Sequence, residues 1–215
     1  RVEHARRVFT ARGAIITLPV GVLPARAGDP GAVSIHPTVP HAAQSLSLLA
    51  SGTVTRVVML FREEFWRRGK LAKVSFLQGA DPDFPVLWTA APAREPVVVA
   101  WAGGPRGAAL ALLSADERRD RAIASAARQF GIPRARLSSL LVESWTHDWE
   151  GDPFSRGAYS YPLVGGSKAG AALARPINGT LYFAGEATVD EADSGTVHGA
   201  IRAGRRAAAQ LLRRL

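Results

Sequence analysis

The stretch from Leu181 to Leu212 constrains the fold of this chain more than any other. It opens with the apolar run Leu181–Ala184, which predicts a short buried strand, and continues through Gly185-Glu186 into a polar loop. A helix is then predicted to begin near Ser194-Gly195 and to run almost to the C-terminus. Small residues recur along it three or four positions apart: Gly199, Ala200, Ala203, Gly204, Ala207 and Ala208. That spacing puts them on one face, where the helix backbone can approach a sheet or a planar ligand closely.

The connection between this strand and this helix has two interpretations. The first helical turn, Gly195–His198, offers unbonded N–H groups and the positive end of the helix dipole, and the glycine turn at Gly185 precedes it. Strand, glycine turn and helix N-terminus together are typical of a cradle for an anion or a cofactor. The same residues are equally consistent with an ordinary strand-to-helix connection.

Composition places the chain among soluble globular proteins of one or two domains. Its 215 residues are 47% hydrophobic and 21% charged. No apolar run approaches the roughly 18 residues of a membrane-spanning helix, so we expect no membrane span. The chain has no cysteine, which excludes disulfides, thiolate metal sites and a thiol nucleophile. The compartment stays undecided on this ground, and a cytoplasmic location is the default assumption.

The charge balance is basic but dispersed. The chain carries 27 Lys and Arg against 18 Asp and Glu, a net charge of +9, which permits contact with nucleic acid. The basic residues are scattered, apart from Arg205-Arg206 and Arg213-Arg214, so we expect no nucleic-acid partner. The chain begins at Arg1 and its only methionine is Met59, from which we expect that it is not a complete, unprocessed translation product.

The middle of the chain is predicted to be a mixed sheet with helices. The Gly- and Pro-rich stretch Pro24–Pro40 is where we expect a domain crossing, and a short helix is predicted over residues 41–50. Strand candidates then follow, separated by Gly and Pro clusters: Thr53–Phe61, Lys73–Gln78, Val86–Ala90, Val97–Trp101 and Leu140–Trp145. Their tight spacing favours antiparallel neighbours.

One helix in this region has clear start and stop signals. Ser114 with Glu117 three residues on is a capping box, and Gly131 and Pro133 mark the end of the helix. Together with the strands it predicts an α+β unit from about residue 31 to residue 142.

Residues 149–161 form a loop rich in aromatic residues and glycine. Its aromatic side chains could form a wall beside a flat ligand or pack the loop on the core, and from the residues alone we favour packing. The five histidines show no metal-ligand spacing, so we expect no metal, and no Ser/His/Asp arrangement emerges.

Four stretches in this order carry a resemblance to the flavin amine oxidases, the superfamily of monoamine and polyamine oxidases, L-amino-acid oxidases and flavin-type histone demethylases. They are Ile15–Leu23, Phe61–Trp66, Trp149–Tyr161, and FAGEAT with the following SGTVHGAIRAGRRAA. The resemblance implies an α/β and α+β fold, the C-terminal part of a discontinuous, Rossmann-like FAD-binding domain with an inserted mixed-sheet substrate domain. Residues 1–30 and 143–215 would belong to the FAD-binding domain, and residues 31–142 to the substrate-binding domain.

The resemblance also implies cofactor contacts. Thr17, Leu18 and Pro19 would pass close to FAD, with Trp149 and Phe154 against the flavin and Ala158 near its ring. Gly185 and Glu186 would sit at the pyrophosphate, and Val197 would offer its backbone N–H near the pyrimidine end of the flavin, where a donor stabilises negative charge. Gly195, Thr196, Tyr159 and Ala200 complete the implied cofactor residues. Monoamine oxidases have, at the position of Ala158, the cysteine that bonds to FAD; this chain has none, so any FAD is expected to be noncovalent.

Three residues are implied in catalysis, which in this family is hydride transfer from an amine or amino-acid-type substrate to flavin N5. Tyr159 would face a small-molecule amine substrate, and Thr196 replaces the second aromatic residue of the substrate cage, as in demethylase-like members. Arg56 stands where many members have a lysine hydrogen-bonded through water to N5. Arginine stays charged and has a planar fork, so it is not a simple replacement. The alternative is a plain solvated residue at Arg56, in a degenerate, non-catalytic homologue that acts as a protein-interaction module.

The family's N-terminal βαβ unit, with its GxGxxG turn and ribose-binding acid, has no counterpart in this sequence. Gly103–Gly107 is too short and lacks the residues that would follow it. We therefore expect a partner: the missing N-terminal FAD-binding half, as a separate chain or cut from the same one.

Overall fold

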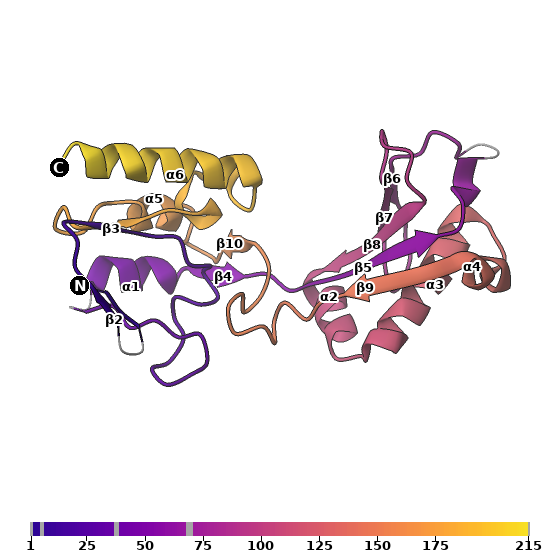
Figure 1. The fold of residues 1–215 in the computed structure, drawn as a ribbon, viewed down its shortest axis with the longest axis horizontal. Helices are drawn as coiled ribbons and strands as arrows, with labels where there is room; N and C mark the ends of the chain where they lie inside the picture. The colour runs from indigo at the N-terminus through magenta and orange to yellow at the C-terminus, as the bar shows by residue number, and fades with distance from the viewer. Residues whose placement is uncertain (1, 5–6, 37–38, 68–70, 215) are drawn as a thin grey trace. The chain divides into compact units, whose positions relative to one another are not determined.

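The chain crosses twice between two structural units, once at Gly52–Thr53 and once at Gly151–Asp152. The structure is a computed structural model, and it describes residues 2–4, 7–36, 39–67 and 71–214 (Figure 1). Unit 1 comprises Arg1–Gly52 and Asp152–Leu215, and unit 2 comprises Thr53–Gly151. Both ends of unit 2 lie together, because the hydroxyl of Thr53 donates a hydrogen bond of 2.7 Å to the carboxylate of Glu150.

These limits differ from the 31–142 expected for the inserted domain. Residues 31–52 belong to unit 1, since the helix and strand that they contain pack and pair with residues after 152. Residues 143–151 belong to unit 2, because they complete its sheet and its closing contact. That the two units are a cofactor domain and a substrate domain stays a prediction.

Unit 1 is built around a two-stranded parallel sheet, β3 (Ala14–Ile16) and β11 (Leu181–Phe183). Alternate residues of β11 face opposite ways, as a strand requires. Phe183 packs in a cluster with α1 (Pro40–Leu46) and α5 (Ala169–Leu173), whereas Tyr182 packs on α6 (Val197–Leu212). The sheet is thus enclosed between α6 on one face and α1 with α5 on the other (Figure 1).

The remaining elements of unit 1 are short. They are the antiparallel hairpin β1 (Val2–His4) and β2 (Arg7–Phe9), the antiparallel pair β4 (Leu49–Ser51) and β10 (Ser160–Pro162), and the single turns η2 (Glu186–Thr188) and η3 (Glu191–Asp193). The helix predicted over residues 41–50 was therefore wrong in its second half. Its helical part ends at Leu46, because the backbone of Leu49–Ser51 pairs with β10.

Helix α6 confirms the small-residue face that the sequence indicated. Gly199, Ala203 and Ala207, four residues apart, are buried; Ala203 and Ala207 pack on Tyr182 of the sheet, and Gly199 lies against the turn that precedes the helix. Gly199 has the closest approach: a Cβ placed there would lie 2.2 Å from the carbonyl oxygen of Asp193. Only glycine fits at that point.

Unit 2 is a five-stranded antiparallel sheet of order β6-β7-β8-β5-β9 with helices on one face (Figure 1). The strands lie close to their predicted places: β5 (Val54–Phe61), β6 (Phe76–Gln78), β7 (Val86–Thr89), β8 (Val97–Gly103) and β9 (Leu141–Thr146). The helical elements are η1 (Phe65–Arg67), α2 (Gly104–Ala111), α3 (Ala115–Phe130) and α4 (Arg134–Leu140). Val57, Met59, Leu87 and Ala100 form the core under α2 and α3.

Helix α3 has the capping box read from the sequence. The Ser114 hydroxyl accepts from the Glu117 backbone N–H at 3.3 Å, and the Glu117 carboxylate accepts from the Ser114 N–H at 2.9 Å. Gly131 ends the helix in the left-handed conformation, with φ +66°. None of the described helices is both long and apolar enough to cross a membrane.

A buried carboxylate ties the β6–β7 connection to α3. Asp81 accepts hydrogen bonds from the Arg128 guanidinium at 2.8 Å and the Ser125 hydroxyl at 2.6 Å, and from the backbone N–H groups of Asp83 and Phe84, both at 3.0 Å. Burial alone would raise the pKa of Asp81, but these donors outweigh it and lower the pKa.

The lowered pKa predicts acid sensitivity of unit 2. The ionised Asp81 contributes stability above its unfolded pKa, about 3.9, and this contribution is lost as pH falls through the lower folded pKa. We expect the difference in unfolding free energy between wild type and Asp81→Asn to be constant from about pH 7 to 5 and to shrink below about pH 4. Urea unfolding followed by fluorescence measures it. If the free-energy difference between the two proteins stays constant down to about pH 2, the stabilising role of the ionised Asp81 is contradicted.

Candidate functional site

A cavity of about 300 Å³ lies in unit 1, where the loop after β3, the residues before β10, the end of β11 and the first turns of α6 meet. Its lining is mostly small or apolar, and it comprises Thr17, Leu18, Pro19, Val20, Leu23, Ala158, Tyr159, Leu173, Phe183, Ala184, Gly185, Glu186, Ala187, Thr188 and Ala200. Segments distant in sequence thus converge on one concave surface, which is the usual form of a small-molecule site.

The backbone at the end of β11 presents donors beside this cavity. Gly185 has φ +132°, a conformation that side chains rarely allow, and a Cβ placed there would meet no atom within 4 Å. Within the described part of the chain, the N–H groups of Gly185, Glu186 and Ala187 have no hydrogen-bond partner. Successive free N–H groups in a turn of this kind favour an anion.

The carboxylate of Glu186 joins three segments. It accepts from the Ser160 backbone N–H at 3.1 Å, from the Ser160 hydroxyl at 2.8 Å and from the Gly195 backbone N–H at 2.7 Å. Both carboxylate oxygens are therefore engaged by the chain itself. Glu186 fixes the residues after β11 to the start of β10 and to the loop before α6.

Helix α6 begins with a side-chain cap. The Thr196 hydroxyl accepts from the Gly199 N–H at 3.0 Å and donates to the Asp193 carbonyl at 2.6 Å. The backbone N–H of Val197 has no partner among the described residues, and its side chain is 78% exposed. Gly195 lies against Tyr159, since a Cβ on the glycine would be 3.4 Å from the Tyr159 ring. Tyr159, Thr196 and Val197 are thus held close together.

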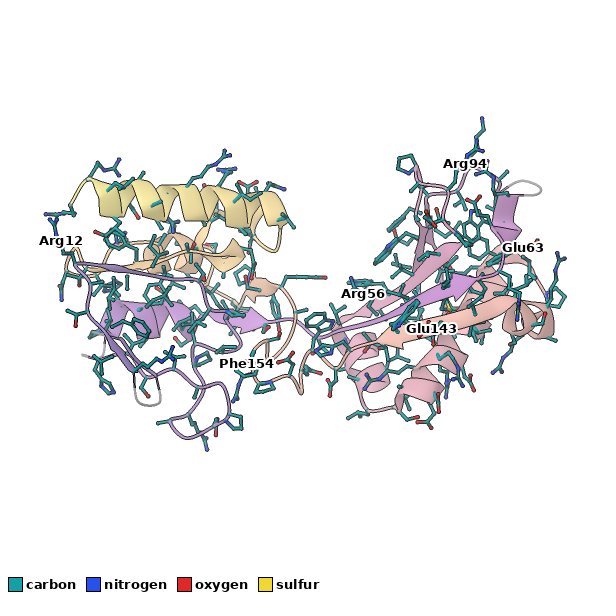
Figure 2. All side chains as sticks on the ribbon, in the orientation of Figure 1. Arg12, Arg56, Glu63, Arg94, Glu143 and Phe154 are labelled. Atoms are coloured by element: carbon teal, nitrogen blue, oxygen red, sulfur yellow. The ribbon has the colours of Figure 1, made fainter. Side chains whose placement is uncertain are left out.

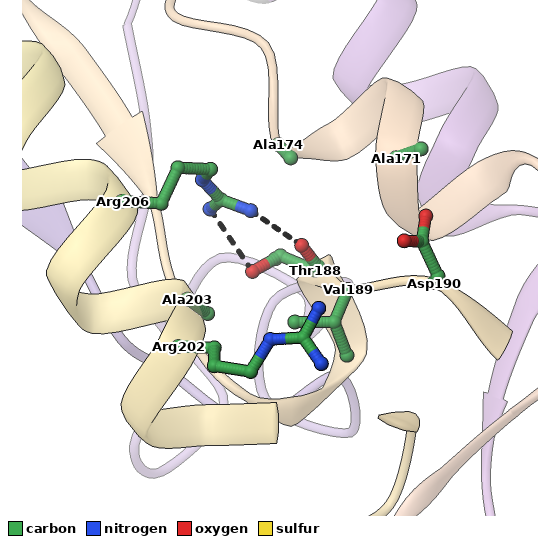
Figure 3. A pocket seen from close by; sticks show the side chains of 8 residues that line it. All are labelled: Ala171, Ala174, Thr188, Val189, Asp190, Arg202, Ala203 and Arg206. Atoms are coloured by element: carbon green, nitrogen blue, oxygen red, sulfur yellow. Dashed lines mark hydrogen bonds between the residues drawn. The ribbon is translucent and has the colours of Figure 1, made fainter. Parts of the chain in front are cut away.

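Arg206 ties α6 to the residues that follow β11, and Figure 3 shows its two hydrogen bonds to Thr188. Its guanidinium donates to the carbonyls of Phe183 and Thr188, both at 2.5 Å, and to the Thr188 hydroxyl at 3.2 Å. Burial lowers the pKa of Arg206. The residue lines a separate hollow of about 360 Å³, beside Arg202, which pairs with Asp193. Its bonds to backbone carbonyls indicate a structural role.

The structure brings most of the predicted cofactor residues to one place. Thr17, Leu18, Pro19, Ala158, Tyr159, Gly185, Glu186 and Ala200 line the cavity. Gly195, Thr196 and Val197 adjoin it through the Glu186 and Tyr159 contacts. Their roles toward a cofactor stay predictions.

Three predicted residues are not part of this group. Phe154 is in unit 1 but does not line the cavity; it is 71% exposed and lies beside Gly31. Trp149 belongs to unit 2, with its ring centroid 4.5 Å from that of His147. Arg56 also belongs to unit 2, on β5, and its side chain has no hydrogen bond or salt bridge to any described residue.

Sequence reasoning missed Ser160 and Arg206. Ser160 adjoins Tyr159 in the aromatic loop, and nothing in the local pattern marks it as the partner of Glu186. Arg206 is one of several arginines on α6. Its one distinguishing signal is its position next to the small-residue face, three residues after Ala203.

The donor set and the shape of the cavity fit part of a flavin cofactor. Small side chains at Ala158, Ala184 and Ala200 leave room for a flat ring, and the free N–H groups after β11 suit a pyrophosphate. A Cβ at position 185 would extend into this space. The residues present therefore support binding of such a group.

Comparison with known proteins points the same way. A family model described as flavin containing amine oxidoreductase matches residues 2–212. Lysine-specific histone demethylase 1 homolog 1 of Arabidopsis thaliana is 30% identical over 99% of this chain and 25% of its own length. Polyamine oxidase 4 of Oryza sativa subsp. japonica is 31% identical over 96% of this chain and 40% of its own length.

Solved structures share the fold. Cyclohexylamine oxidase from Brevibacterium oxydans IH-35A has a TM-score of 0.78 at 21% identity, covering 98% of this chain and 44% of that one. Wild-type putrescine oxidase bound to putrescine has a TM-score of 0.75 at 24% identity, covering 93% of this chain and 42% of that one. The chain thus spans less than half the length of each of these relatives.

Proposed function

This chain belongs to the flavin-containing amine oxidoreductase family, and from that premise we propose that it is the C-terminal portion of an FAD-dependent oxidoreductase acting on amines. The observation that carries the proposal is the convergence of the β3 loop, the residues before β10, the end of β11 and the start of α6 on one cavity. These segments belong to three of the four stretches through which the sequence resembles the family, and the fourth, Phe61–Trp66, is in unit 2.

The proposed roles follow from the contacts within unit 1. The N–H groups of Gly185 to Ala187 bind the cofactor's pyrophosphate, and Thr17, Leu18 and Pro19 pass along one side of it. Glu186 positions Ser160 and Gly195 through its carboxylate, and the free N–H of Val197, two residues after Gly195, would donate to the flavin. Ala158 adjoins the ring without a covalent bond, since the chain has no cysteine.

FAD, when bound, would accept a hydride from the carbon next to the amine nitrogen. Tyr159 contributes an aromatic face for the substrate, and Thr196 contributes a compact neighbour held by its cap bonds. Arg56 is proposed as the third catalytic residue, offering a fixed positive charge. Trp149 and Phe154 are proposed to contact the flavin only in the assembled protein.

A further FAD-binding segment is proposed as partner, on the ground of an open strand edge. Among the described residues, β3 pairs with β11 alone, so the second edge of β3 has no neighbouring strand. Parallel sheets are usually larger and covered on both faces. A strand from an N-terminal half carrying GxGxxG would complete this sheet and supply the site for the ADP portion of FAD.

The test is reconstitution of a flavin spectrum. The purified chain alone is expected to retain little FAD, and a mixture with an N-terminal FAD-binding half carrying GxGxxG is expected to recover flavin absorbance. Acid precipitation should release all of the flavin, because no covalent bond holds it. Tight, stoichiometric FAD in the isolated chain would contradict the proposed division of the site.

A matched pair of variants makes this test specific. Gly185→Ala places a methyl group in the cavity and should lower FAD affinity at least about tenfold, whereas Gly28→Ala should leave it unchanged. Both glycines have positive φ and open space around them, +132° and +95°, but only Gly185 lines the cavity. Equal losses in both would indicate backbone strain alone.

Position 56 holds an arginine where many members of the family have a lysine. This difference favours a second candidate function, a non-catalytic homologue that serves as a protein-interaction module. If the reconstituted flavoprotein is never reduced by amines, this alternative holds. Amine-dependent bleaching of the flavin under anaerobic conditions would exclude it.

A further inference from the structure

One arginine of unit 1 holds both ends of the turn that follows β11. The guanidinium of Arg206 donates to the carbonyl of Phe183, the last residue of β11, and to that of Thr188, the last residue of η2, both at 2.5 Å. A third bond, of 3.2 Å, reaches the Thr188 hydroxyl (Figure 3). Arg206 therefore restrains the Gly185–Ala187 segment from its two ends.

The turn is also closed from within by Thr188. Its backbone N–H and its hydroxyl donate to the Gly185 carbonyl at 3.1 and 3.0 Å. Thr188 thus links the guanidinium of Arg206 to the first residue of the segment whose N–H groups are free. Phe183 and Thr188 are each 3% exposed, so water competes little for these hydrogen bonds. Loss of the guanidinium should therefore change the directions of the N–H groups of Gly185–Ala187.

Arg206 acts on this turn from outside the cavity. The cavity is lined by Phe183 and Thr188, whereas Arg206 lines the separate hollow of about 360 Å³. A planar guanidinium donates to two acceptors in fixed directions at once, and a lysine ammonium lacks this geometry. The side chain is thus suited to set the backbone geometry of the turn and not to touch a ligand in the cavity.

The charge of Arg206 has no acidic partner among the described residues. Its guanidinium bonds only to oxygen atoms of Phe183 and Thr188, and its Nε is buried without a hydrogen-bond partner in the described part of the chain. Asp190, in the same hollow, forms no salt bridge with it. Arg94, by contrast, is exposed and projects away from unit 2 (Figure 2). An anion bound at the turn would offset the positive charge of Arg206.

We propose that Arg206 is a positioning residue for anion binding in unit 1. It holds the turn from Phe183 to Thr188 in the conformation in which the free N–H groups of Gly185–Ala187 receive the pyrophosphate of the cofactor. This inference rests on the proposed function for the identity of the anion. It adds the residue that sets the geometry of the donors.

The test compares two neighbouring arginines of α6. Arg206→Ala is expected to weaken FAD binding by the reconstituted protein at least about tenfold, the effect of one lost hydrogen bond to a charged group. Arg205→Ala is the matched control, because Arg205 is exposed and forms no hydrogen bond or salt bridge with a described residue. It removes the same charge and should leave the affinity unchanged. An equal loss in both variants, or no loss in Arg206→Ala, would overturn the inference.

Two readouts separate positioning from general support of unit 1. Amide hydrogen exchange at Thr188 should become faster in Arg206→Ala, whereas exchange at Ala14, whose N–H donates to the Thr180 carbonyl at 2.8 Å, should not change. Guanidinium chloride, at a concentration that leaves the protein folded, should restore part of the lost affinity, because the hollow has room for the ion. Sodium chloride at the same concentration should not. If Ala14 loses protection together with Thr188, or guanidinium restores nothing, the inference fails.

A measurement on the chain alone distinguishes this inference from the proposed function. The probe is inorganic pyrophosphate, and NMR spectra report the backbone N–H groups of Gly185–Ala187. Pyrophosphate should shift these signals saturably in wild type and in Arg205→Ala, and far less in Arg206→Ala. If it does so while the reconstituted protein binds no FAD, the proposed function fails and the role of Arg206 stands. Equal shifts in all three proteins, or shifts in none, would refute that role.

Discussion

Replacing Glu186 with alanine is expected to loosen the candidate site and to lower FAD affinity in the reconstituted protein by about 100-fold. Three hydrogen bonds to a charged acceptor end on this carboxylate. Such bonds contribute about 1.5–3 kcal/mol each and are not additive, so we expect a loss of about 3 kcal/mol, or a factor of about 100. Amide hydrogen exchange at Ser160 and Gly195 reports the local opening directly, and flavin fluorescence titration reports the affinity.

Two further variants test the assignment of Glu186. Glu191→Ala removes an exposed acid from the same loop and should change neither exchange nor affinity. Glu186→Gln keeps one acceptor oxygen and should lie between wild type and alanine. If Glu186→Ala lowers FAD affinity while Ser160 and Gly195 stay protected, the carboxylate contacts the cofactor directly and does not act by positioning.

Replacing Asp81 with alanine is expected to destabilise unit 2 by about 3 kcal/mol. The substitution removes the nearer acceptor of the buried Phe84 N–H, the acceptor of the fully buried Ser125 hydroxyl and the closer of the two acids that contact Arg128. For a unit of this size the melting temperature should fall on the order of 10 °C or more. Calorimetry measures this shift in melting temperature.

Asp83→Ala is the matched control. Asp83 is two residues away and contacts Arg121 and Arg128, but at 3.3 and 3.5 Å, and both arginines are about half exposed or more. Its loss should cost less than about 1 kcal/mol. Equal effects of the two substitutions would show that charge at this turn matters more than the hydrogen bonds of Asp81.

Local signals predicted the parts of the fold that local interactions stabilise. The capping box at Ser114 and the glycine at Gly131 delimit α3 within their own turns, and runs of β-branched and aromatic residues between Gly and Pro clusters located β5 and β8. Short elements with no such signal were missed. Helix α2 begins at Gly104-Pro105, where proline suits the first turn, and no helix was predicted over these residues.

Pairing between distant segments decided the rest. Leu49–Ser51 follows a helical pattern in the sequence, but hydrogen bonds to Ser160–Pro162 make it a strand. The family resemblance implied cofactor contacts for eight residues that line the cavity. It could not show that the Glu186 carboxylate is engaged by Ser160 and Gly195, because those contacts span 26 and 9 residues of sequence and depend on the folded arrangement.

The contact between Thr53 and Glu150 bears on how this architecture can diversify. The two ends of Thr53–Gly151 are held together by this hydrogen bond. Unit 2 therefore closes the gap between Gly52 and Asp152 at about the entropic cost of a short loop. Changes in the length or lining of unit 2 therefore cost unit 1 little chain entropy. Such a junction lets unit 1 accept insertions of different length and sequence without a change in the residues that line its cavity.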